Sequence, residues 1–194
     1  GVLPQYVLSP STLIYATGAP YRELRISKIT PDWQLEETAV APGRYSDLAV
    51  SPDGTRLAAT LLNTDLDVWV YSLEDGKGRR VTRGDDNHHP MWSDDGDTIY
   101  FKHSGSDEPD GIYFTSSTSA LFERTLALET QFNADEVHAG DLALLREWNG
   151  EDADYVVVNL RTGEKAVVAN RVGVHEDLGN LSPDGEWVAL TVDA

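Results

Sequence analysis

The tetrapeptide Ser51-Pro52-Asp53-Gly54 decides the fold, because it recurs along the chain at a nearly regular interval. It returns as Ser93-Asp94-Asp95-Gly96 and as Ser182-Pro183-Asp184-Gly185. The turn glycines are 42 residues apart in the first step and 89 in the second, which is close to two further periods. Degenerate copies fall at Ala139-Gly140-Asp141 and at Ser9-Pro10-Ser11. A fixed period of this length indicates a repeat protein.

Each copy of the turn lies between two short apolar segments, such as residues 48–50 and 56–59. Proline presets φ, aspartate bonds the nearby backbone, and glycine accepts a positive φ, so the copies predict tight turns between strands. A third strand is expected over residues 67–71, 110–114 and 154–158, and a fourth over 35–40, 79–82 and 166–168. Only residues 121–129 would also suit a helix.

Four short antiparallel strands per period of about 42 residues are typical of a β-propeller blade. We therefore predict an all-β propeller of four-stranded antiparallel blades that occupies residues 1–194. The approximate blades are 1–42, 43–86, 87–130 and 131–172, with a half blade over 173–194.

The turn sequence, followed by an apolar strand and Asp67-Val68-Trp69-Val70-Tyr71, resembles the WD40-like repeats of TolB-type propellers. Within that class, residues 7–18, 24–26 and 44–47 resemble the propeller that follows the catalytic domain of certain bacterial serine/threonine kinases. The resemblance implies a sensing or protein-binding module that is extracytoplasmic, either periplasmic or secreted. It also implies a ring of six or seven blades, so the remaining blades of the same propeller are one expected partner.

Composition excludes several other classes of protein. The chain has 194 residues, with 15 Lys and Arg against 33 Asp and Glu, a formal net charge of −18 and no cysteine. This charge would repel nucleic acid, and the absence of cysteine excludes a disulfide scaffold and a thiol nucleophile. We expect no membrane insertion and no targeting segment within these residues. The scarcity of lysine fits either a high-salt habitat or an ordinary acidic surface.

The sequence has no catalytic set. It contains no Walker A or G-x-G-x-x-G loop, no H-E-x-x-H and no G-x-S-x-G, so we expect no enzyme and no cofactor within this chain. The predicted function is binding or sensing of a protein or peptide in a bacterial envelope or signalling protein. The alternative is the substrate-gating propeller of a prolyl-oligopeptidase-type or dipeptidyl-peptidase-type serine peptidase, whose catalytic domain would lie outside the chain.

Two sets of residues are candidates for binding. His88, His89, Asp47 and Asp177 occupy equivalent ends of the first strands of their repeats, where imidazole and carboxylate could hold a divalent cation in the central channel. The alternative is that these are solvated loop residues. Trp33 and Trp148 fall in turns and, with His175, are candidates for partner contact. The strand aromatics Trp69, Trp92, Tyr100, Tyr113 and Trp187 are expected to pack between blades.

Overall fold

The computed structural model describes most of the chain as strands and turns. The described residues are 6–9, 12–17, 23–30, 32–63, 65–118, 121–130, 137–139, 141–148, 153–169, 176–182 and 184–192. The chain divides into two compact units, Gly1–Leu126 and Ala127–Ala194, and each is treated by itself below.

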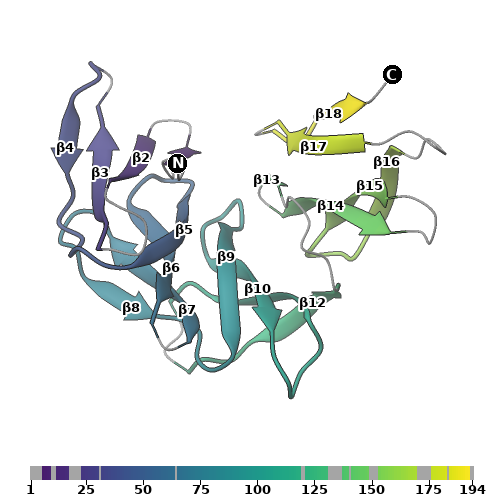
Figure 1. The fold of residues 1–194 in the computed structure, drawn as a ribbon, viewed down its shortest axis with the longest axis horizontal. Coiled ribbons are helices and arrows are strands. Elements are labelled where there is room, and N and C mark those ends of the chain that lie inside the picture. Colours follow the sequence, from purple (N-terminus) through teal and green to yellow (C-terminus); the bar gives the residue numbers. More distant parts are fainter. Residues whose placement is uncertain are drawn as a thin grey trace. The chain divides into compact units, whose positions relative to one another are not determined.

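The first unit is built from three consecutive four-stranded antiparallel sheets, and the boundary between the units falls within the last strand of the third sheet (Figure 1). Neighbouring strands in each sheet are also neighbours in sequence. The first strands β1, β5 and β9 contact one another in that order. The sheets comprise β1 (Tyr6–Ser9), β2 (Thr12–Thr17), β3 (Arg25–Ile29) and β4 (Leu35–Glu37); β5 (Tyr45–Val50), β6 (Arg56–Leu62), β7 (Leu66–Ser72) and β8 (Gly78–Arg80); and β9 (Asp86–Trp92), β10 (Thr98–Ser104), β11 (Gly111–Ser116) and β12 (Thr125–Glu129).

The second unit repeats the same pattern. One sheet runs β13 (Val137–Ala139), β14 (Leu142–Trp148), β15 (Ala153–Asn159) and β16 (Lys165–Ala169), and β17 (Glu176–Leu181) pairs with β18 (Val188–Val192). A core of Leu144, Tyr155 and Leu181 joins the two sheets of this unit.

The repeated turn is stabilised by hydrogen bonds within the turn itself. The Ser51 hydroxyl donates to Asp53 Oδ1 at 2.5 Å and accepts the backbone N–H of Arg56 at 2.9 Å. This hydroxyl contact, with the backbone N–H of Thr55, lowers the pKa of Asp53 to about 2. Ser93 with Asp95 and Ser182 with Asp184 repeat the hydroxyl–carboxylate contact. The turn glycines have φ of 71–72°, a conformation that glycine adopts without the steric cost of a side chain.

The second and third sheets of the first unit are joined by apolar packing and by one arginine. Val68, Trp92, Ile99 and Phe101 are among the residues of their shared core. Arg56 Nη2 donates to the carbonyl of Gly96 at 2.9 Å, and its guanidinium lies 4.6 Å from the centre of the Trp92 ring.

The expectation that Trp187 packs between blades is wrong, because 73% of its surface is exposed. Trp187 has the same position in the repeat as Arg56, five residues after the turn serine. The backbone N–H of Trp187 donates to Ser182 Oγ, just as the backbone N–H of Arg56 donates to Ser51 Oγ. At this position Arg56 bonds the next sheet at Gly96, whereas Trp187 is exposed, so burial here depends on contacts outside the residue's own sheet. Trp92, Tyr100 and Tyr113 are buried as expected, and Trp69 is partly buried.

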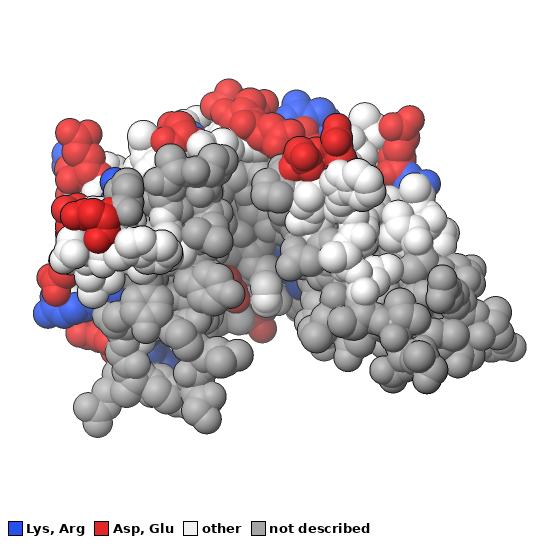
Figure 2. Space-filling view, turned by 90° about the horizontal axis from the view of Figure 1, so that it is seen from above, with Lys and Arg blue, Asp and Glu red and all other residues white. Residues whose placement is uncertain are grey.

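The predicted all-β class is confirmed. Residues 121–129, which would also suit a helix, end in strand β12, and the described residues include no helix. There is accordingly no apolar helix of membrane-crossing length among them. Carboxylates are more prominent than Lys and Arg on the face shown in Figure 2.

Candidate functional site

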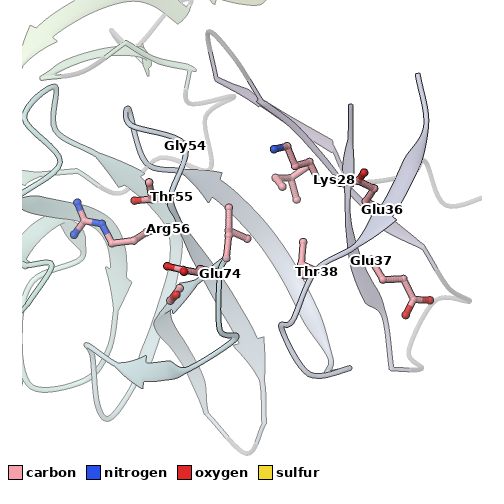
Figure 3. Close-up of a pocket in the computed structure, with 11 residues that line it drawn as sticks. Lys28, Glu36, Glu37, Thr38, Gly54, Thr55, Arg56 and Glu74 are labelled. Carbon is pink, nitrogen blue, oxygen red and sulfur yellow. The ribbon is translucent and has the colours of Figure 1, made fainter. Parts of the chain in front are cut away.

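A cavity of about 490 Å³ lies between the first two sheets of the first unit (Figure 3). We call it the inter-sheet cleft. Strands β2 to β4 supply one wall, and the turns before β6 and after β7 supply the other. Its lining residues are Ile14, Lys28, Glu36, Glu37, Thr38, Gly54, Thr55, Arg56, Ser72, Leu73 and Glu74.

The first wall of the cleft follows from strand register. Ile14 pairs with Lys28 across β2 and β3, and Lys28 pairs with Glu36 across β3 and β4. Side chains directly opposite one another lie on the same face of a sheet. The row therefore runs from a fully buried isoleucine, through a lysine, to an exposed glutamate.

Two of the charged groups at the cleft are engaged elsewhere. Arg56 directs its guanidinium toward Gly96 and Ser117, and Glu37 forms an ion pair of 3.3 Å with Arg25. In Figure 3 both side chains extend away from the cleft. Lys28, Glu36 and Glu74 remain, and none forms a hydrogen bond or ion pair with another described residue through its side chain. Two carboxylates and one ammonium are thus available to a ligand.

Trp33 lies at the tip of the β3–β4 hairpin, three residues before Glu36. It is 81% exposed, which agrees with its selection as a candidate for partner contact. The Trp148 side chain and the whole of His175, the other two candidates, lie outside the described residues.

The proposed metal-binding residues lie at a bulge that three first strands share. Two residues of the first strand face one residue of the second at residues 46–47, 89–90 and 178–179. Counted back from the turn serine, Asp47, His89 and Leu178 are equivalent. His89 has a φ of 51°, which is uncommon for a residue with a side chain.

The structure brings three of the four proposed metal ligands near one another. His89 Nε2 lies 3.5 Å from Asp47 Oδ1, and the rings of His88 and His89 are 4.9 Å apart. His88 Nδ1 is buried without a hydrogen-bond partner among the described residues, and burial followed by the charge of His89 lowers the pKa of His88.

Among the described residues, however, no three His, Asp or Glu side chains are arranged to hold a metal ion. The side chain of Asp177 lies outside those residues. The four-residue cation site therefore stays a prediction.

Sequence reasoning missed a second polar cluster, at the opposite end of β10 from the repeated turn. His103 is fully buried, and its Nδ1 lies 3.1 Å from Asn87 Oδ1. Because Asn87 Nδ2 donates to the Gly84 carbonyl, Oδ1 is the acceptor and His103 Nδ1 the donor. The Nε2 atom has no hydrogen-bond partner among the described residues, and Glu108 Oε2 lies 3.9 Å away.

Arg124 organises the groups around His103. Its Nε donates to Glu108 Oε2 at 2.5 Å, and its Nη1 donates to Asn87 Oδ1 at 3.3 Å. Burial lowers the pKa of His103 most, and the positive charge of Arg124 lowers it further. These residues are scattered along the sequence and form no recognisable motif, so only the three-dimensional arrangement reveals this cluster.

Comparison with known proteins shows similarity of structure without recognisable similarity of sequence. No family model matches the chain, and no curated protein matches it. A putative TolB from Agrobacterium tumefaciens aligns at a TM-score of 0.73 and 15% identity, over 96% of this chain and 68% of that one. TolB from Acinetobacter baumannii aligns at a TM-score of 0.68 and 14% identity, over 88% of this chain and 44% of that one.

Peptidase propellers are similar to the same degree. A structure from a study of two prolyl endopeptidases aligns at a TM-score of 0.66 and 14% identity, over 93% of this chain and 31% of that one. The chain thus spans less than half the length of the A. baumannii TolB and about a third of the endopeptidase. The resemblance to kinase-associated propellers stays a prediction. The fold is that of the β-propellers found in TolB and in prolyl-oligopeptidase-type enzymes.

Proposed function

We propose that this chain is a non-enzymatic propeller module that binds a protein or peptide, in an extracytoplasmic part of a bacterial envelope or signalling protein. The inter-sheet cleft is the observation that carries the proposal. It combines a buried apolar floor at Ile14 with charged side chains that no described residue pairs. Concave sites with a few convergent polar groups on an apolar base are the usual form of a ligand site.

The chemistry available at the cleft favours binding over catalysis. Its hydroxyl groups are already used locally: Thr38 Oγ1 donates to the Ile26 carbonyl at 2.9 Å, and Thr55 Oγ1 donates to Asp53. Neither lies in a hydrogen-bonded series with a histidine, which an activated nucleophile would require. Recognition by charge and shape is what these residues can supply.

A blocked-cleft experiment tests the function. A random seven-residue peptide library displayed on phage is selected against the 194-residue chain. The enriched peptides are then measured against Glu74→Trp, which places a large side chain at the mouth of the cleft. Lys77→Trp is the matched control, because it alters the same turn without lining the cleft. The proposal expects at least a tenfold loss of affinity in the first variant and none in the second. Failure to enrich any peptide, or equal binding by both variants, would refute it.

A second function, the gating propeller of a serine peptidase, is favoured by the structural similarity to a prolyl endopeptidase over 93% of this chain. The full-length gene separates the two. An α/β-hydrolase domain with a G-x-S-x-G motif downstream supports the peptidase. A kinase domain and one membrane span upstream support the sensing module.

A further inference from the structure

Trp33 is held in a conformation that its side chain disfavours. Its φ is 63°, in the left-handed region, where the Cβ atom of an L-residue crowds the backbone. Thr30 fixes this geometry. The Thr30 carbonyl accepts the Trp33 N–H at 2.9 Å, and its Oγ1 accepts the Gln34 N–H at 3.0 Å. The hairpin tip is therefore well defined, and it presents the indole outward.

Fold stability does not explain a tryptophan at this position. An 81% exposed side chain removes little apolar surface from water on folding, whereas the left-handed backbone costs free energy. Glycine or asparagine would satisfy the same turn at lower cost. Strained backbone and exposed aromatic rings concentrate at binding sites.

The charges beside Trp33 specify the kind of ligand. Glu36 and Glu74 in the cleft outnumber Lys28, and Asp32 lies next to Trp33. The carboxylates of the cleft attract a cation, and a guanidinium or ammonium can donate charge-assisted hydrogen bonds to them. A carboxylate ligand would meet repulsion from Glu36 and Glu74.

We propose that the inter-sheet cleft receives an arginine or lysine side chain of an extended peptide segment, and that Trp33 contacts an apolar residue of the same segment. Glu36 lies three residues after Trp33, so at most about 10 Å of backbone separates the two contacts. Three residues of extended peptide span that distance. This inference rests on the proposed function and adds the chemistry of the partner.

The test uses three fluorescent seven-residue Gly/Ser peptides that differ at one position. Each carries Leu-Ser-Ser-X, with X as Arg, Gln or Glu, and binding to the 194-residue chain is followed by anisotropy at 0.15 M salt. The Arg peptide should bind at least tenfold more tightly than the Gln peptide, and the Glu peptide should bind most weakly. Replacing Arg by Lys should preserve binding.

Matched variants separate the cleft from the general negative charge. Glu36→Gln and Glu74→Gln should each weaken the Arg peptide about fivefold, and Trp33→Ala and Trp33→Gly about tenfold or more. Glu129→Gln removes one exposed charge outside the cleft, and Trp187→Ala removes one exposed indole; both should bind normally. Circular dichroism confirms that each variant is folded.

Three results would overturn the inference. Equal weakening by Glu36→Gln and Glu129→Gln would show attraction to the overall charge alone. Preference for the Gln or Glu peptide, still sensitive to Glu74→Trp, would preserve the proposed function and refute the cationic partner. Absence of binding by all three peptides, with cleft-dependent peptides recovered from the phage library, would do the same. If none of the three peptides binds and the phage library yields no cleft-dependent peptide, the proposed function is refuted as well.

Discussion

At the scale of single residues, Trp33 gives the sharpest prediction about stability. Trp33→Gly should be more stable than Trp33→Ala by about 1 kcal/mol, because alanine retains the Cβ atom that the left-handed backbone disfavours. Elsewhere in a strand or helix, glycine is the less stable of the two. Urea unfolding followed by circular dichroism measures the difference. An alanine variant that equals or exceeds the glycine variant would show that the turn is not strained.

His103 predicts a dependence of stability on pH. Burial, and then Arg124, lowers its pKa in the folded protein, so the unfolded chain takes up a proton first as the pH falls through the ordinary value of 6.5. The free energy of unfolding should therefore decrease from pH 7 to pH 5. The negative charges of Asp85, Glu108 and Asp110 raise the pKa of His103 and so oppose this shift without reversing it.

The variant His103→Gln tests that assignment, since glutamine can still donate to Asn87 Oδ1 but does not titrate. Its stability should vary less between pH 7 and pH 5 than that of the native chain. His88, whose pKa burial also lowers, contributes with the same sign, so the double variant with His88→Gln should vary least. An unchanged slope in His103→Gln would contradict the role given to this ring.

At the scale of strands and turns, the sequence was informative wherever a local rule applies. The turn glycines all have a positive φ, and the apolar segments on either side of each turn are strands β5, β6, β9, β10, β17 and β18. These features depend on neighbours within about ten residues, so the tetrapeptide and the strand alternation predict them. The bulges at residues 46–47, 89–90 and 178–179 have no such local signal.

Contacts between sheets could not be predicted in the same way. Arg56 and Trp187 occupy the same position of the repeat, yet one is bonded to the next sheet and the other is exposed. The inter-sheet cleft likewise arises from residues on strands that are distant in sequence, such as Lys28 and Glu74. Among the residues at or beside this cleft, only Trp33, an isolated and exposed aromatic in a turn, could be selected from the sequence as a candidate for binding.

Arg56 therefore predicts how the sheets are coupled. Arg56→Lys should destabilise the first unit by about 1–2 kcal/mol, because lysine cannot donate to Gly96 and Ser117 together while stacking on Trp92. Arg44→Lys is the matched control, since Arg44 is exposed and its side chain forms no hydrogen bond or ion pair with another described residue. Urea midpoints of the three proteins give the comparison. Equal midpoints would mean that apolar packing alone joins these sheets.

At the scale of the whole molecule, the net charge is the dominant feature. Residues 1–44 are neutral overall, so the −18 resides in residues 45–194. The hairpin tip at residues 107–110 is exposed and carries three carboxylates, and the face shown in Figure 2 has many more. Mutual repulsion of like charges opposes the compact state.

Stability should consequently rise with sodium chloride. The Debye length is about 8 Å at 0.15 M salt and about 3 Å at 1 M, so added salt removes most of the repulsion between neighbouring loops. Thermal unfolding between 0.05 and 1 M sodium chloride measures the effect, and sucrose at equal osmolarity controls for solvent exclusion. A midpoint that stays constant across the series would exclude charge repulsion as a limit on stability.

The same measurement with divalent ions tests the predicted site of His88, His89, Asp47 and Asp177. If these residues bind a cation, millimolar manganese or calcium should raise the unfolding midpoint beyond sodium chloride of matched ionic strength, because binding to the folded state alone stabilises it. Asp47→Asn should abolish that excess, since it removes the carboxylate 3.5 Å from His89 Nε2. Screening acts on all carboxylates alike, so Asp47→Asn should leave the response to sodium chloride nearly unchanged. Equal midpoints in divalent and monovalent salt would refute the metal site, and the His89–Asp47 contact would then be only a polar link between β5 and β9.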